Sequence, residues 1–228
     1  MQLKKTSVIL FDVNETLIDM SPLKKRVNHL LGTKNGFRIW FGMLLQYSLV
    51  DNCTNQYHDF SVIASATLGM AARSLNITIE QKEILAALSV IKELEAYPEV
   101  EKGLKILQKG GFRLATLTNS PARVLLEQLD NSRLTEYFEL KLSIDTIKKY
   151  KPAKQTYHWA AKQLKVNPDE IIMVAAHGWD IAGALQAGLQ AGFIERKGQS
   201  LYPLATMPYF IGKDLIEIAN SIVSQKNA

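Results

Sequence analysis

The sequence predicts an α/β fold: a doubly wound parallel sheet with a helical insertion after its first strand. Two apolar runs rich in β-branched residues, at residues 8–11 and 171–176, are typical of buried strands. From residue 98 onward, strand-like runs alternate with helix-like runs, which is the pattern of parallel βαβ units. Between the first strand and that region, residues 22–96 carry helical periodicity.

The first strand is followed directly by Asp12 and then by the long helical stretch. Mostly apolar residues recur there at intervals of three and four, as they do on one face of a helix. Pro98 ends the stretch, because proline is disfavoured inside helices. The residues at helical spacing are Phe37, Trp40, Phe41, Leu44, Tyr47 and Ser48, and then Phe60, Ile63, Ala64 and Leu68.

After Pro98 the elements are short and are separated by turn residues. Gly110 and Gly111 end one helix, as glycine often does at helix C-termini, and Gly188 ends another. Pro121 stands near the start of a helix, where its fixed φ is compatible with the first turn. The expected elements are helices at 100–108, after 121, at 152–164 and at 181–187, and strands at 113–117, 140–144, 171–176 and 190–194.

These elements divide the chain into two predicted domains. Residues 1–18 and 98–228 form the sheet core, and residues 19–97 form a helical cap over the edge at which the strands end. A chain of 228 residues can bury cores of this size. The formal net charge of +5 favours anionic ligands.

Composition narrows the class of protein further. The single cysteine, Cys53, cannot form an internal disulfide, so we expect a reducing, cytoplasmic location. No apolar run is long enough to span a bilayer, so no membrane partner is expected. No interleaving of aromatic and basic residues suggests nucleic acid. The densest basic cluster, Lys148, Lys149, Lys151 and Lys154, is mostly interpreted as a solvated face.

Polar residues of distinct types stand at four predicted strand ends. They are Asp12, Thr118-Asn119, Lys151 and the segment 177–180 with sequence HGWD. Parallel strands bring their carboxyl ends to one edge of the sheet, where ligands bind in open α/β folds. Asp12 could simply cap the next helix, but its neighbours at this edge favour a carboxylate nucleophile.

The order and spacing of these motifs resemble the haloacid dehalogenase superfamily, and most closely its type II L-2-haloacid dehalogenases. The matching segments are Trp40 to Tyr47, 55–60 (NQYHDF), 150–152 (YKP) and 179–184 (WDIAGA). The resemblance covers essentially the whole chain. It implies a Rossmann-like core with an aspartate nucleophile and an inserted cap, and a homodimer. The implied activity is that of an (S)-2-haloacid dehalogenase, which converts halogenated carboxylic acids, namely short-chain L-2-haloacids, to 2-hydroxy acids and halide.

Two positions separate dehalogenases from phosphatases within that superfamily. Phosphatases have a second aspartate where this chain has Asn14, and an acidic residue where it has Ala176, which leaves Asp180 alone. We therefore expect neither a metal nor another cofactor, with Lys151 as a fixed cation in place of Mg²⁺. A metal-dependent phosphatase acting on a small phosphate ester and a non-catalytic small-acid binding protein stay open as alternatives.

The resemblance implies a two-step mechanism. Asp12 displaces halide from C2 of the acid, and water then attacks the carboxyl carbon of the resulting ester. Lys151 keeps Asp12 ionised, and Asp180 orients Lys151 or Thr118. The residues expected to bind substrate are Val13, Asn14, Thr118, Asn119, Tyr47, Phe60 and Trp179.

Three departures from the family pattern change the expected roles. Phe41 stands where the family has a halide-binding arginine, so either Arg38 or an aromatic pocket of Phe41, Phe60 and Trp179 takes the halide. Ala175 replaces a serine. His177 replaces an asparagine and Glu15 replaces a glycine, which predicts a histidine base paired with a carboxylate for activating water.

Overall fold

The computed structural model describes residues 6–226, and within them six parallel strands form one sheet. The strand order is β3-β2-β1-β4-β5-β6, so the predicted α/β fold with a parallel sheet is confirmed. Residues 1–5 and 227–228 of the predicted core lie outside the described residues. The strands are β1 (Val8–Phe11), β2 (Arg113–Thr118), β3 (Leu140–Ser143), β4 (Ile171–Ala175), β5 (Gln190–Ile194) and β6 (Phe210–Gly212).

Strand β1 is the centre of the sheet. Its Val8 pairs with Arg113 of β2 on one side and with Ile171 of β4 on the other. All four residues of β1 and all five of β4 are buried, because helices cover both faces of a parallel sheet. The strand order reverses beside β1, and in such sheets the ligand site lies at that reversal.

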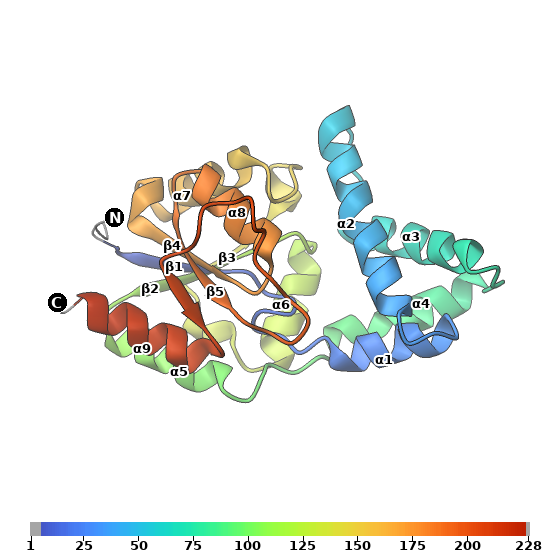
Figure 1. Ribbon diagram of the computed structural model, residues 1–228, viewed down its shortest axis with the longest axis horizontal. Coiled ribbons are helices and arrows are strands. Elements are labelled where there is room, and N and C mark those ends of the chain that lie inside the picture. The colour runs from blue at the N-terminus through green and yellow to red at the C-terminus, as the bar shows by residue number, and fades with distance from the viewer. Residues whose placement is uncertain (1–5, 227–228) are drawn as a thin grey trace.

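Helices pack on both faces of the sheet (Figure 1). Helices α5 (Val100–Lys109) and α9 (Leu215–Lys226) pack against each other along one face. Their approach needs Gly103, since a Cβ there would lie 2.5 Å from Cγ of Leu215. The other helices of the core are α6 (Ala122–Asn131), α7 (Lys154–Leu164) and α8 (Gly178–Gln186), with short 3₁₀ turns at Thr135–Tyr137, Ile144–Thr146 and Pro168–Glu170.

The helical stretch between β1 and α5 is several helices rather than one, and we call it the helical insertion (residues 21–92). It stands beside the sheet, to the right in Figure 1. Trp40 is buried between α2 and α3, and its indole Nε1 donates to the carbonyl oxygen of Ala64 at 2.9 Å. Its elements are α1 (Ser21–Leu30), α2 (Gly36–Thr54), α3 (Phe60–Ser74), α4 (Gln81–Ser89) and η1 (Val90–Lys92).

Several boundaries differ from those predicted. Helix α8 begins at Gly178, three residues earlier than expected, because His177 takes the N-cap position with extended backbone. Strand β6 and helix α9 were not predicted; β6 has only three residues, too few for a periodic signal. The division into a core and a cap domain at residues 18 and 98 stays a prediction.

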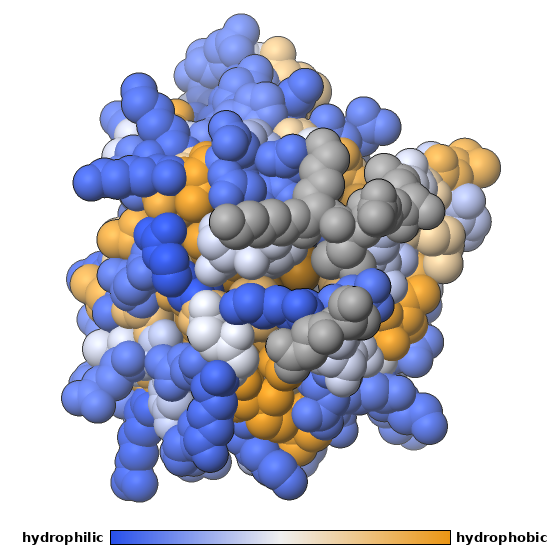
Figure 2. Space-filling view, turned by 90° about the vertical axis from the view of Figure 1, so that its left-hand side faces the viewer, coloured by the Kyte–Doolittle hydropathy of each residue, from blue (hydrophilic) through white to orange (hydrophobic). Residues whose placement is uncertain are grey.

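Two observations concern the outer surface. Figure 2 shows the face of the core that lies on the far side from the helical insertion, and most of the described side chains on it are hydrophilic. Among residues 6–226 no helix has the length and apolar character needed to cross a bilayer.

Candidate active site

Asp12 lies at the carboxyl end of β1 with three side chains around its carboxylate. Lys151 Nζ donates to Oδ1 at 2.9 Å, while Thr16 Oγ1 donates to Oδ2 at 2.7 Å. His177 Nδ1 lies 3.2 Å from the same Oδ2. Burial opposes ionisation of Asp12, but Lys151 and His177 outweigh it and hold the pKa of Asp12 well below its usual value. The group is therefore a carboxylate throughout the physiological pH range.

Lys151 is a buried cation between two carboxylates. Its Nζ lies 2.9 Å from Asp12 Oδ1 and 2.6 Å from Asp180 Oδ2. Burial opposes the ammonium charge, yet Asp12 and Asp180 raise the pKa of Lys151 above its usual value. Tyr157 donates its hydroxyl to the other oxygen of Asp180 at 2.6 Å, which fixes that carboxylate against the lysine.

Two asparagines hold the backbone that carries Lys151. The Asn119 side chain accepts from Lys151 N at 2.9 Å and donates to Lys151 O at 3.4 Å. Asn52, on α2 of the insertion, accepts from Tyr150 N at 2.9 Å and donates to Tyr150 O at 2.8 Å. One amide from the core and one from the insertion therefore fix the backbone of two consecutive residues, Tyr150 and Lys151.

His177 lies between two carboxylates. Its Nε2 is 3.0 Å from Glu15 Oε2, and its Nδ1 faces Asp12. Glu15 adopts a left-handed backbone conformation with φ 59°, and Gln199 donates to its Oε2 at 3.0 Å. Burial opposes the imidazolium, but the hydrogen bonds to Asp12 and Glu15 outweigh it and raise the pKa of His177 to about 9. In this arrangement His177 is charged at neutral pH, so the neutral base expected from sequence requires the loss of a neighbouring negative charge.

Aromatic rings enclose the imidazole of His177. Trp179 stacks on it with ring centroids 5.2 Å apart, and Phe41 stacks with centroids 6.1 Å apart. Lys151 Nζ lies 5.7 Å from the centroid of the Trp179 ring, within the range of a cation–π contact. Phe60 packs on Tyr150 with centroids 5.7 Å apart. Phe41, which stands where the resemblance implies a halide-binding arginine, thus contacts His177 through its ring.

The side chain of Asn14 forms hydrogen bonds with two side chains of the core. Its Nδ2 donates to Ser120 Oγ at 2.9 Å, and its Oδ1 accepts from Gln128 Nε2 at 2.9 Å. Gln128 is fully buried and also donates to the carbonyl of Ile91 in the insertion. Among residues 6–226 no group of three or more histidine, cysteine or acidic side chains is arranged to hold a metal ion.

The remaining predicted site residues do not all reach this centre. The side chain of Val13 is fully buried in the hydrophobic core and its carbonyl accepts from Leu17 and Ile18, so the substrate-binding role of this residue stays a prediction. Thr118 is buried, and its Oγ1 accepts from Ser120 N at 3.1 Å. Arg38 and Tyr47 are exposed on α2.

Several residues of the site were missed by sequence reasoning. Thr16 could have been found, because it lies four residues after Asp12 in the same turn. Ser120, Gln128, Tyr157 and Gln199 carry no local signal, since each contacts a partner far away in sequence.

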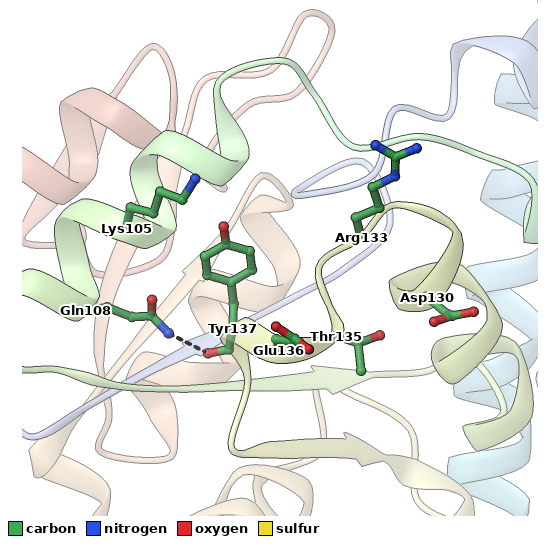
Figure 3. Close-up of a pocket in the computed structure, with 7 residues that line it drawn as sticks. All are labelled: Lys105, Gln108, Asp130, Arg133, Thr135, Glu136 and Tyr137. Atoms are coloured by element: carbon green, nitrogen blue, oxygen red, sulfur yellow. Dashed lines mark hydrogen bonds between the residues drawn. The ribbon is translucent and has the colours of Figure 1, made fainter.

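A separate hollow lies elsewhere on the core, away from Asp12. It has a volume of about 600 Å³ and lies between α5 and the segment that follows α6 (Figure 3). Gln108 donates across it to the carbonyl of Tyr137 at 3.3 Å, and the exposed Lys105 pairs with Glu101. Its lining, Lys105, Gln108, Asp130, Arg133, Thr135, Glu136 and Tyr137, shares no residue with the cluster around Asp12.

Comparison with known proteins gives consistent family matches. A family model described as haloacid dehalogenase-like hydrolase matches residues 6–188. The chain is 30% identical over 191 residues to (S)-2-haloacid dehalogenase 4A of Burkholderia cepacia, covering 83% of each chain. It is 29% identical over 197 residues to a phosphoglycolate phosphatase of Colwellia psychrerythraea (strain 34H), covering 84% of this chain and 85% of that one.

Solved structures share the fold over nearly the whole chain. The L-2-haloacid dehalogenase from Xanthobacter autotrophicus with chloropropionic acid covalently bound superposes with a TM-score of 0.87, covering 95% of this chain and 98% of that one. Its sequence is 19% identical, so this likeness is one of fold.

Proposed function

Because this chain belongs to the haloacid dehalogenase-like hydrolases, we propose that it is a hydrolytic dehalogenase that converts L-2-haloacids, including short-chain ones, to 2-hydroxy acids and halide. One observation carries the proposal: the buried Asp12 carboxylate is held ionised by Lys151 at 2.9 Å. Asn14 and Ala176 agree with it, because the resemblance implies acidic residues at these two positions in metal-dependent phosphatases. A permanently ionised carboxylate beside a fixed cation suits attack at a carbon that carries a halogen.

In the first step, a carboxylate oxygen of Asp12 attacks C2 from the side opposite the halogen. The new O–C2 bond forms as the carbon–halogen bond breaks, and the bonding electrons leave with the halide. The ammonium of Lys151 and the imidazolium of His177 hold the attacking carboxylate, and the halide leaves on the opposite side of C2. Of the two expected halide sites, the aromatic pocket is the better supported, because Phe41 contacts His177 while Arg38 is exposed.

In the second step, the ester itself changes the charge of His177. Alkylation removes the negative charge of Asp12, one of the two carboxylates that raise the pKa of His177. The pKa then falls, and the imidazolium loses to solvent the proton on Nδ1, the nitrogen that faces the ester. Glu15 accepts from Nε2 and thereby keeps Nδ1 free as the base.

Water is the nucleophile of this second step. Nδ1 of His177 takes a proton from water as the water oxygen bonds to the carboxyl carbon of Asp12. The bond between that carbon and the ester oxygen breaks, and the imidazolium of His177 passes its proton to that oxygen, so the 2-hydroxy acid leaves with an oxygen that came from Asp12. The second proton of the water returns to His177 as the carboxyl group of Asp12 ionises. Asp12 regains its charge and carries an oxygen from water. A single turnover in ¹⁸O-water should therefore label Asp12 and leave the product unlabelled.

A phosphatase is the second candidate, since a phosphoglycolate phosphatase is among the relatives. It would need Mg²⁺, and the amide oxygen of Asn14 is already bonded to Gln128. The test is halide release from L- and D-2-bromopropionate and from bromoacetate, with and without EDTA. L-selective release that is indifferent to EDTA is the expected result. Mg²⁺-dependent release of phosphate with no halide would contradict it, and binding without turnover would indicate a non-catalytic protein.

We also propose that two copies of the chain associate as a homodimer. The exposed apolar side chains on the insertion support this: Leu49 and Val50 near the end of α2 are 42% and 41% exposed, and Val62 on α3 is 57% exposed. Light scattering should give the mass of two chains, and Val62→Glu should shift it toward one.

A further inference from the structure

An apolar cavity of about 200 Å³ lies between the helical insertion and the core. Rings and aliphatic groups from three helices of the insertion form its walls, among them Trp40 and Leu44 of α2, Ala64 of α3 and Leu88 of α4. Val124 of α6 closes it from the core side. A space of this kind is not filled by the packing of the fold itself, although protein interiors are otherwise close-packed.

One end of this cavity is lined by residues that adjoin the site around Asp12. Phe41 lines the cavity and also stacks on His177. Asn14 and Ser120, which are hydrogen-bonded to each other, line it as well, and Asn14 lies two residues after Asp12. The cavity thus lies next to the proposed reaction centre.

The outer end of the cavity is charged. Lys92 of η1 and Arg123 of α6 both line it, and both face Glu127, at 2.8 Å and 3.5 Å. One of these ion pairs joins the insertion to the core, so an ionic contact lies across the mouth. The interior remains apolar, and such cavities bind apolar groups in preference to water.

We propose that this cavity holds the alkyl side chain of the substrate, so that the preferred acids are medium-chain 2-halo fatty acids rather than haloacetate or halopropionate. This inference rests on the proposed dehalogenase function. At roughly 30 Å³ for each heavy atom, the share of a water molecule in the liquid, the cavity takes about six atoms. With C1 and C2 at the reaction centre, the matching acids have roughly six to eight carbons.

The first experiment is a chain-length series of L-2-bromo acids from three to ten carbons. Burial of each methylene should raise kcat/KM about fourfold until the cavity is full, followed by a plateau or a fall. A maximum at three carbons, with a decline at every longer chain, would overturn the assignment.

A pair of alanine variants on α3 localises the effect. Ala64 is buried and lines the cavity, whereas Ala66 on the same helix is exposed and lies outside it. In Ala64→Leu, the ratio of kcat/KM for 2-bromooctanoate to that for 2-bromopropionate should fall at least tenfold, because the added side chain occupies the space. The ratio should not change in Ala66→Leu. An equal ratio in both variants would overturn the assignment.

Binding of unreactive acids separates this inference from the proposed function. Calorimetry on the wild-type protein should show 2-hydroxyoctanoate binding at least tenfold more tightly than lactate, whether or not any acid is turned over. Tight binding of 2-hydroxyoctanoate with no halide release from any acid would support the cavity assignment and contradict the proposed dehalogenase function. Halide release from bromopropionate, together with equal affinity for the two hydroxy acids, would support the dehalogenase function and contradict the cavity assignment.

Discussion

The side-chain amide of Asn52 forms two hydrogen bonds with the backbone of Tyr150, 98 positions later in the chain and immediately before Lys151. Both bonds are short, with donor–acceptor distances of 2.8 and 2.9 Å. A residue of the helical insertion therefore controls the backbone that presents the buried cation to Asp12. The position of the insertion and the position of Lys151 are linked through this contact.

Asn52→Ala should lower kcat at least tenfold without a matching rise in KM, because Lys151 loses its fixed backbone. Two lost hydrogen bonds should also lower the free energy of unfolding by about 2 kcal/mol. Steady-state kinetics and urea denaturation measure the two effects. Thr54→Ala on the same helix is the control, since its hydroxyl bonds only within α2. Unaltered kcat in Asn52→Ala would remove the positioning role.

Thr16→Val should lower kcat/KM by one to two orders of magnitude. The hydroxyl of Thr16 donates to Asp12 and accepts from the buried backbone N–H of Ala176, so valine leaves both groups without a partner. Thr16→Ser keeps the hydroxyl and should retain most activity. Equal loss in both variants would contradict this role of the hydroxyl, because serine keeps the group that forms both hydrogen bonds.

Lys151→Met should make the alkylation step dependent on pH. In the wild-type protein Lys151 and His177 keep the pKa of Asp12 well below its usual value, so the rate should stay constant as the pH falls toward 5. Without the ammonium, burial and Asp180 raise that pKa, and the rate should fall with decreasing pH. Rapid-quench detection of the ester measures this, with the exposed Lys154→Met as control. A flat profile in Lys151→Met would contradict the role.

His177→Ala should trap the Asp12 ester, because alkylation does not need the imidazole as a base while hydrolysis does. Intact-protein mass spectrometry should show the mass of the unreacted variant increased by the mass of the halo acid minus that of hydrogen halide. The double variant Asp12→Asn, His177→Ala should show no adduct. Multiple turnovers by His177→Ala at the wild-type rate would exclude the histidine from the second step.

The charge of His177 should also appear in the pH dependence of stability. Its pKa in the folded protein is about 9, above the unfolded value of 6.5, so the stabilisation is complete below about pH 6.5 and is lost as the pH rises through 9. The total is about 3 kcal/mol, at about 1.4 kcal/mol for each pKa unit. Urea denaturation at pH 6 and pH 9.5 should show this loss in the wild-type protein and not in His177→Gln. If the free energy of unfolding of the wild-type protein relative to His177→Gln rose between pH 6 and pH 9.5, the raised pKa of His177 would be contradicted.

Local sequence patterns were sufficient to locate most strands of the sheet. The apolar runs at residues 8–11 and 171–176 identified β1 and β4 because buried parallel strands need continuous apolar residues. The same patterns could not locate β6, which has three residues, or the breaks between α1 and α4, where the helical periodicity persists across short turns. Strand ends were the reliable guide to the site, since parallel strands deliver them to one edge.

The sequence by itself determined the fold class and the residues Asp12, Lys151, His177 and Asp180 at one edge of the sheet, because local periodicity and chain direction are enough for that. The family followed from the resemblance that its motifs carry. Only the tertiary structure decided the protonation of His177, which depends on two carboxylates that approach it together. It also decided the partners of Asn52 and Asn14 and the apolar cavity, because side chains more than 90 positions apart meet only when the chain is packed.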